Sequence, residues 1–187
     1  MKLIFDIETD GLISSVTKVH CIVIKNLDTN KIYSFKYDEL DKALKLLSDA
    51  TLLVGHNILK FDIQVIKKLY PNFKHKKIFD TLLVSRLIFT NRKEEDFRIK
   101  EVPTTLIGRH SLESWGYRLG LRKGDFVKTG NFSQWSQEMQ DYCKLDVEVT
   151  SELYNLILKQ NLRRSGISSL LIPRLSVRLK MDTQKIY

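Results

Sequence analysis

Cysteine, proline, glycine and long apolar runs are all scarce in this chain of 187 residues, which holds two cysteines, three prolines and eight glycines. So few prolines and glycines exclude collagen-like and low-complexity architectures. Cys21 and Cys143 stand too far apart in sequence for a clustered cysteine metal motif, and a reducing compartment is expected. Apolar runs such as those within residues 51–54 and 170–172 are short, and none exceeds four residues, too few to cross a bilayer. Three acids within the first ten residues exclude a signal peptide. We therefore expect a cytoplasmic protein without membrane contact.

Basic residues outnumber acidic ones, with 31 Lys and Arg against 22 Asp and Glu and a formal net charge of +9. This excess favours a polyanionic partner, most often nucleic acid or an acidic membrane surface. It is unevenly spread, because residues 163–187 hold six basic residues and one acidic residue. The length and an apolar fraction of 43% suit one globular domain with a sizeable core.

The hydrophobic pattern predicts a mixed α/β domain. Alternating or continuous apolar residues predict five strands, over residues 2–9, 17–26, 31–37, 51–54 and 77–79. Helical spacing predicts five helices, over residues 39–50, 59–70, 81–89, 111–119 and 136–160. Short polar turns between the first three strands favour an antiparallel arrangement for them. Charged, non-periodic residues 90–110 and 120–131 are expected as loops. This order suits a ribonuclease H-like mixed sheet with helices packed on it.

Two carboxylates share one face of the first predicted strand. Because side chains alternate along a strand, Asp6 and Glu8 point the same way as Ile4. Ionised carboxylates inside a sheet are costly unless they are paired or bind a metal. The alternative is that the strand lies at an edge of the sheet and water solvates both acids.

Two predicted helices also place an acid on their apolar faces. Asp62 begins the stripe of one helix, and Asp146 interrupts the stripe of the last, one turn after Tyr142. Four converging acids suit hard divalent cations such as Mg²⁺ or Mn²⁺, which take oxygen ligands. Two such ions about 3.5–4 Å apart are the usual device for phosphodiester displacement. With a basic chain, the acids indicate metal-dependent phosphodiester hydrolysis.

Three short motifs, FDIET at 5–9, NILKFD at 57–62 and YCKLD at 142–146, resemble those of the four-acid (DEDD) exonucleases. Tyr142, four residues before the last acid, matches the tyrosine subtype, because the histidine subtype would need histidine where Asp141 stands. Residues 78–88 and 112–120 resemble, more narrowly, the 3′–5′ proofreading domain of bacteriophage family A DNA polymerases. The resemblance covers residues 1–160.

This resemblance implies a 3′–5′ exonuclease that uses two divalent cations, Mg²⁺ or Mn²⁺, and releases nucleoside 5′-monophosphates from single-stranded or frayed DNA 3′ ends. The implied metal ligands are Asp6, Glu8, Asp62 and Asp146. Tyr142 would orient the attacking water together with Glu8. The implied contacts to the 3′-terminal nucleotides are Thr9, Leu12, Asn57 and Phe61, with Leu12 wedged between bases. For a phage-encoded protein, the compartment would be the cytoplasm of the bacterial host.

Two other functions stay open: an RNA-trimming exonuclease of the ribonuclease D kind, and a catalytically silent nucleic-acid-binding module. Residues 1–162 are expected to form the exonuclease domain. Residues 163–187 are expected to form a basic tail that starts with a linker. No polymerase domain follows, so we expect a stand-alone exonuclease, a truncation, or one part of a split enzyme with a separately encoded polymerase subunit.

Several other residues are expected to have structural or surface roles. Asp80 should cap a helix rather than act as a fifth ligand, and Trp115 and Tyr117 should pack a short helix onto the sheet. His56 is expected to be structural, with a DNA contact as the minority alternative. Basic residues of the two predicted loops could line a strand-binding groove, with a solvated surface as the default: Arg92, Lys93, Arg98, Lys100, Arg122, Lys123 and Lys128.

Overall fold

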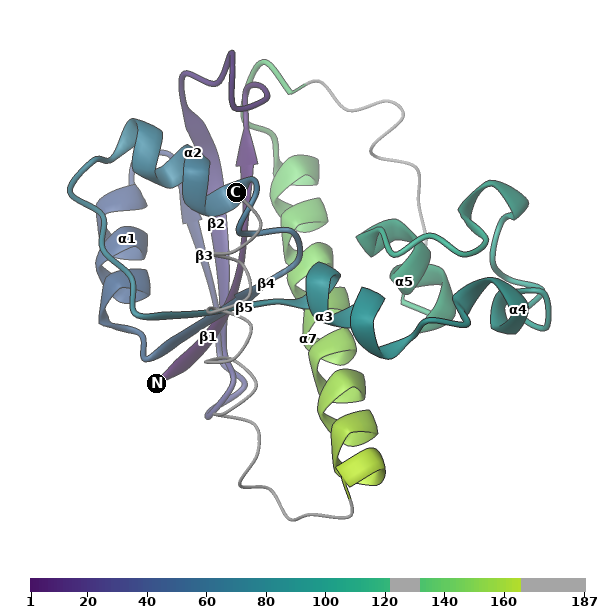
Figure 1. Cartoon of the computed structure of the whole chain (residues 1–187). Helices are drawn as coiled ribbons and strands as arrows, with labels where there is room; N and C mark the ends of the chain where they lie inside the picture. Colours follow the sequence, from purple (N-terminus) through teal and green to yellow (C-terminus); the bar gives the residue numbers. More distant parts are fainter. Residues whose placement is uncertain (122–131, 166–187) are drawn as a thin grey trace.

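The computed structural model describes residues 1–121 and 132–165. Its centre is a five-stranded sheet with the order β3-β2-β1-β4-β5 (Figure 1). The strands are β1 (Lys2–Thr9), β2 (Val19–Asn26), β3 (Ile32–Lys36), β4 (Leu52–Gly55) and β5 (Lys77–Asp80). The first three pair antiparallel, whereas β4 and β5 run parallel to β1. The predicted mixed sheet is therefore confirmed.

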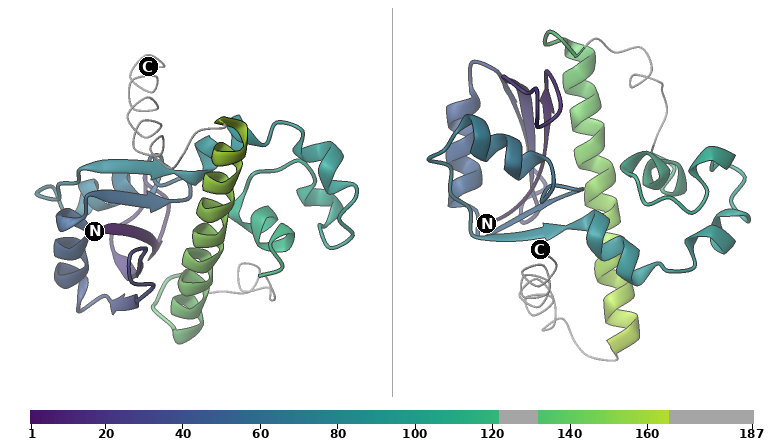
Figure 2. Two further views of the ribbon diagram at one scale, coloured as in Figure 1. Left: turned by 90° about the horizontal axis from the view of Figure 1, so that it is seen from below. Right: turned by 45° about the horizontal axis from the view of Figure 1, so that its top comes forward.

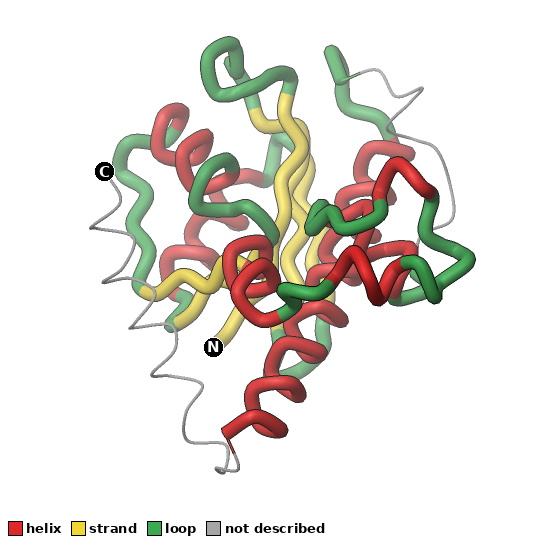
Figure 3. The backbone as a smooth tube through the Cα atoms, turned by 45° about the vertical axis from the view of Figure 1, so that its right-hand side comes forward, coloured by secondary structure: helices red, strands yellow, loops and turns green. Residues whose placement is uncertain are grey.

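Helices cover both faces of the sheet (Figures 1 and 2). On one face lie α1 (Leu40–Asp49) and α2 (Asp62–Leu69). On the other lie α3 (Thr81–Ile88) and the long α7 (Gln137–Ser165), and α5 (Leu112–Arg118) packs on α7 farther from the sheet. Figure 3 shows the same layers from another side, with the strands between two sets of helices. Within the described residues, no helix is long and apolar enough to span a membrane.

Strand β1 feeds two separate hydrophobic cores because its side chains alternate. Leu3, Phe5 and Ile7 pack in the core beneath α1 and α2, while Ile4 packs in the core beneath α3, α5 and α7. The even-numbered face of β1 therefore looks toward α7, with Asp6 and Glu8 following Ile4 on it.

Helix α7 begins after Ser136, whose hydroxyl accepts a hydrogen bond from the Met139 N–H at 3.1 Å. It continues to Ser165, three residues into the segment that we expected to be a linker. The remainder of the expected basic tail lies outside the described residues, as do Arg122, Lys123 and Lys128.

The prediction of a loop without helices over residues 90–110 is wrong in part, because two short helices lie within it. The segment contains α4 (Arg92–Asp96) and the 3₁₀ helix η1 (Thr104–Leu106). Asp96 is buried and accepts two hydrogen bonds from the Arg118 guanidinium, at 2.8 and 2.7 Å. Arg92 is also buried, so it lines no open groove. Asp96 and Arg118 are 22 residues apart, and no local hydrophobic period could reveal their pairing.

Candidate active site

Asp6 and Glu8 lie on a central strand, because β2 pairs with one side of β1 and β4 with the other. The alternative of a solvated edge strand is therefore wrong. Asp6 is half-buried, and Glu8 is only 8% exposed. The sheet thus holds two carboxylates away from bulk water, where their charge needs compensation.

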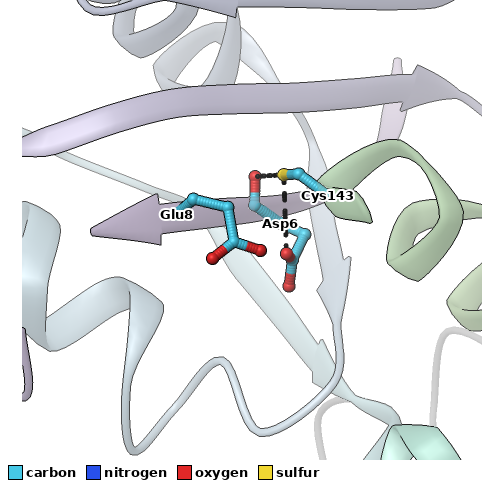
Figure 4. Close-up of side chains that lie close together, drawn as sticks. All are labelled: Asp6, Glu8 and Cys143. Atoms are coloured by element: carbon cyan, nitrogen blue, oxygen red, sulfur yellow. Dashed lines mark hydrogen bonds between the residues drawn. The ribbon is translucent and has the colours of Figure 1, made fainter. Parts of the chain in front are cut away.

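Helix α7 brings a third group, the thiol of Cys143, against this pair (Figure 4). One ligand atom each of Asp6, Glu8 and Cys143 lies within 4.8 Å of the others. The Cys143 Sγ donates to the backbone oxygen of Asp6 at 3.4 Å and to its Oδ2 at 3.5 Å. The thiol therefore fixes the Asp6 carboxylate relative to α7.

The two cysteines, which stand too far apart in sequence for a metal-binding motif, are neighbours in space. Burial and then the neighbouring Cys21, which lies opposite Glu8 in the β1–β2 register, raise the pKa of the Cys143 thiol. Sequence reasoning missed this contact. The available signal was the place of Cys143 inside the YCKLD motif, beside Tyr142 on the helix that carries Asp146.

Asp62 and Asp146 complete the group of acids. Burial raises the pKa of Asp6 well above its usual value, and the charges of Asp62, Asp146 and Glu8 raise it further. The pKa of Glu8 rises to about 9, chiefly through burial and then through the charge of Asp146. These mutual effects place all four acids in one electrostatic cluster.

The start of α2 holds Asp62 in this cluster. Its side chain is 3% exposed, and its carboxylate accepts a hydrogen bond from the backbone N–H of Ile7. Burial raises the pKa of Asp62 to about 7, and the charges of Asp80 and Asp146 add to the rise. A side chain from α2 thus reaches over the end of β1, joining two elements that lie far apart in sequence.

The cluster has the donor set of a divalent-cation site. Among the described residues, Asp6, Glu8 and Asp62 form no ion pair with a basic side chain. Their raised pKa values show that the protein alone does not offset their charge. Hard cations that prefer oxygen ligands would offset it. Tyr142 is half-buried, one helical turn before Asp146 on α7.

The residues predicted to touch nucleotides lie in segments at the same end of the sheet, after β1 and β4. Leu12 is 73% exposed, as a wedge residue would need. Asn57 has a φ of 62°, and Phe61 directly precedes α2. Thr9 is buried, and its hydroxyl donates to the Gly11 carbonyl at 2.9 Å, holding the turn that leads to Leu12.

Asp80 caps α3, as predicted, and it also holds the segment that contains Asn57. Its carboxylate accepts from the N–H groups of Leu82 and Leu83 in α3. It also accepts from the N–H of Asn57 at 3.0 Å and of Leu59 at 3.1 Å. One buried carboxylate therefore ties the helix start to a predicted substrate contact.

Replacing Asp80 by alanine should destabilise the protein by about 2–4 kcal/mol, more than the loss of a helix cap alone, because two further N–H groups lose their acceptor. Urea unfolding followed by circular dichroism measures this change. Asp80→Asn is the matched control, since it keeps one acceptor oxygen and should cost less. A loss below about 1 kcal/mol in Asp80→Ala would contradict the bridging role.

A cavity of about 420 Å³ borders Asn57, and sequence reasoning did not predict it. His56, Arg86, Arg109 and His110 are among the residues that line it. Burial lowers the pKa of both histidines to about 4, so at neutral pH the two arginines supply its positive charge. His56 also pairs with the Thr81 hydroxyl at 2.9 Å, in line with its predicted structural role.

Comparison with known proteins identifies the fold family. A family model described as the RNase H superfamily matches residues 3–158. The chain belongs to the ribonuclease H superfamily. Its curated relatives include the DNA-directed DNA polymerases of Escherichia phage T7, at 32% identity, and Enterobacteria phage T3, at 31%. Each match covers 83% of this chain and 26% of the polymerase, so the chain spans about a quarter of these relatives. The predicted resemblance to phage DNA polymerases is thus confirmed.

Solved structures support the same fold. Brucella melitensis NrnC with bound Mg²⁺ matches with a TM-score of 0.60 and 18% identity, over 98% of this chain and 85% of NrnC. E. coli Exonuclease I in complex with a 5cy-dT13 oligonucleotide matches with a TM-score of 0.57 and 15% identity, over 87% of this chain and 41% of that protein. At these identities the likeness concerns the fold alone.

Proposed function

We propose that this member of the ribonuclease H superfamily is a metal-dependent 3′–5′ exonuclease that acts on single-stranded or frayed DNA ends in the manner of a proofreading domain. The observation that supports the proposal is the electrostatic cluster of four acids, with Tyr142 one helical turn before Asp146 on α7. A protein that only binds nucleic acid would gain nothing from four carboxylates that repel phosphates. The silent binding module is therefore the weakest alternative.

The proposed ligands of two divalent cations, Mg²⁺ or Mn²⁺, are Asp6, Glu8, Asp62 and Asp146. When bound, such ions make water a better nucleophile and stabilise the oxygen that leaves the phosphorus. Tyr142, with Glu8, orients the attacking water through its hydroxyl. Cys143 keeps Asp6 in place through hydrogen bonds to its backbone oxygen and to its carboxylate.

Thr9, Leu12, Asn57 and Phe61 are the proposed contacts to the 3′-terminal nucleotides. Leu12 is the most exposed of them and would separate the last two bases. The cavity beside Asn57 suits a phosphate of the same strand, because Arg86 and Arg109 line it. Contacts of this kind are tolerant of sequence, as removal of any mispaired end requires.

The choice of DNA over RNA rests on the identity with the two phage DNA polymerases. One observation favours RNA trimming as the second candidate, since a solved structure with this fold is NrnC bound to pGG. Incubating the protein with Mg²⁺ and equal amounts of DNA and RNA strands of one sequence discriminates the two. We expect faster shortening of DNA. Faster shortening of RNA would overturn the DNA assignment.

The domain bounds, a partner and a cellular location are also proposed for this chain. The proposed exonuclease domain spans residues 1–162, and the proposed basic tail spans residues 163–187, of which the first three still belong to α7. A separately encoded polymerase subunit is a proposed partner. The proposed location is the cytoplasm of a bacterial host, where replicating DNA would supply the ends.

Tyr142→Phe should lower the turnover number by about 10- to 100-fold, because water that is poorly oriented attacks less often. The Mg²⁺ concentration for half-maximal activity should stay nearly unchanged, since the four acids remain. In the unmodified protein, activity should rise with pH as a water on the metal loses its proton. Steady-state kinetics across a Mg²⁺ and pH series measure these effects. Tyr117→Phe, outside the acid cluster, is the control. A large shift in Mg²⁺ dependence for Tyr142→Phe would contradict the water-orienting role.

A further inference from the structure

A second cavity of about 420 Å³, apart from the acid cluster and the arginine-lined cavity, has a wall of aromatic side chains. Tyr37, Tyr70 and Trp135 line it together with Lys18 and His20. Tyr37 follows β3, Tyr70 follows α2, and Trp135 precedes α7. Three segments far apart in sequence therefore place aromatic rings around one cavity.

This aromatic cavity lies beside the end of the strand that carries the acids. Its residue Val19 pairs with Thr9, the last residue of β1, and Cys21 pairs with Glu8. Adjacent strands are about 4.8 Å apart. The cavity therefore starts one strand away from Thr9. A DNA strand with its 3′ end on the acids is long enough to place another of its bases there.

The wall of the cavity is held in place before any ligand binds. Trp135 Nε1 donates to Gln140 Oε1 at 3.0 Å, and the Lys36 ammonium lies 4.1 Å from the centre of the Trp135 ring. His20 Nε2 pairs with the Phe132 carbonyl at 2.9 Å, fixing the segment before α7 to β2. A preformed wall loses little conformational entropy on binding.

The charges around the cavity favour a neutral, flat ligand. Lys18 and Lys36 are close to it, but so are two acids. Burial and then the charge of Asp41 raise the pKa of Tyr70, so that acid is near the aromatic wall. Asp10 accepts from the N–H groups of Thr17 and Lys18 at the rim. Without a strong excess of positive charge, the rings rather than phosphate contacts decide what binds.

We propose that the aromatic cavity binds a nucleobase of the substrate strand, on the 5′ side of the nucleotide that is removed. The base stacks on the exposed ring of Tyr37, with Tyr70 and Trp135 as the remaining wall. Tyr37 is 61% exposed, which leaves its ring open to a ligand. Stacking accepts every base, since each has a π face. This inference rests on the proposed exonuclease function and adds a second anchoring point for the strand.

Single abasic substitutions in a fluorescent DNA strand test the proposal, with binding measured by anisotropy in Ca²⁺ in place of Mg²⁺. We expect one abasic position, on the 5′ side of the terminal nucleotide, to weaken binding by about 5- to 100-fold. Tyr37→Ala should weaken binding of the intact strand similarly and abolish the further loss at that position. Tyr37→Phe should keep the wild-type pattern. Phe97→Ala is the control, because Phe97 is also exposed but lies outside the cavity.

Tryptophan fluorescence gives a second readout. The chain has two tryptophans, and Trp115 is fully buried, so quenching on addition of DNA reports Trp135. Equal losses at every abasic position, or an unchanged affinity in Tyr37→Ala, would overturn the proposal. The exonuclease function is judged separately, by shortening of DNA in Mg²⁺. If the protein shortens DNA but shows no position-specific abasic effect, only the proposed base-binding role of the cavity is contradicted.

Discussion

We expect Asp6→Asn to lower the rate of DNA hydrolysis by more than about 100-fold. Loss of a residue that only hydrogen-bonds a metal ligand typically costs about 10- to 100-fold, and loss of a ligand should cost more. Besides burial, the charges of Asp62, Asp146 and Glu8 all raise the pKa of Asp6. Asp6 therefore lies within the cluster. An amide in its place keeps the shape of the side chain but removes the charge that a divalent cation needs.

The loss should come without unfolding. In the absence of metal, Asp6→Asn removes repulsion from the other carboxylates, so its melting temperature should equal or exceed that of the wild type. Rates on a labelled DNA strand and thermal melts in EDTA measure the two effects. Asp141→Asn is the control, because Asp141 is an exposed acid on α7, the helix that also carries Asp146. Activity of Asp6→Asn within about tenfold of wild type would contradict its assignment as a ligand.

Without metal, the protein should lose stability as the pH rises from about 7 to 9, where most proteins change little. The pKa of Glu8 is about 9 in the folded protein against 4.5 for a free glutamate, and that of Asp6 is also raised. The folded state therefore binds more protons than the unfolded state in this window. Stability falls wherever that holds. Each pKa unit corresponds to about 1.4 kcal/mol, so the effect should amount to several kcal/mol.

Between about pH 7 and 9 the effect of the acids on stability is separated from that of the histidines. Burial lowers the pKa of His56 and His110 to about 4, and this makes stability rise with pH until the unfolded histidines lose their protons near 6.5. Above about pH 7 both histidines are neutral in the folded and in the unfolded state. The opposing contribution from the histidines is then absent.

Mg²⁺ should reverse the trend, because it binds the ionised carboxylates and not the protonated ones. The gain in melting temperature on adding Mg²⁺ should be larger at pH 9 than at pH 6. Thermal melts at both values, with and without the ion, measure this. Equal gains at the two values, or a metal-free protein that is as stable at pH 9 as at pH 7, would show that the acids do not share one buried cluster.

The sheet and the acids could be predicted because their signals are local. Alternation along β1 placed Asp6 and Glu8 on one face, and the helical stripe placed Asp146 on the apolar side of α7. The burial of Glu8 and Asp146 agrees with these two patterns, and the burial of Asp62 agrees with the apolar stripe of α2. The short polar turns between the first three strands likewise predicted the antiparallel pairing of β1, β2 and β3.

The missed features all depend on contacts between distant residues. Asp96 with Arg118 orders the segment expected to be a loop, and Cys143 meets Cys21 and Asp6 only after α7 packs on the sheet. Arg109 enters a cavity whose other side comes from the segment after β4. No periodic pattern links residues across such separations, so the side-chain partners had to come from the structure.

The direction of strand shortening tests the central claim most directly. A single DNA strand is labelled at its 3′ end in one sample and at its 5′ end in another, and both are incubated with the protein and Mg²⁺. We predict that the 3′ label leaves at once as a nucleoside monophosphate. The 5′ label should remain on a ladder of shortening strands, and EDTA should stop both reactions. Immediate release of the 5′ label, internal cuts, or equal activity in EDTA would contradict a metal-dependent 3′–5′ exonuclease.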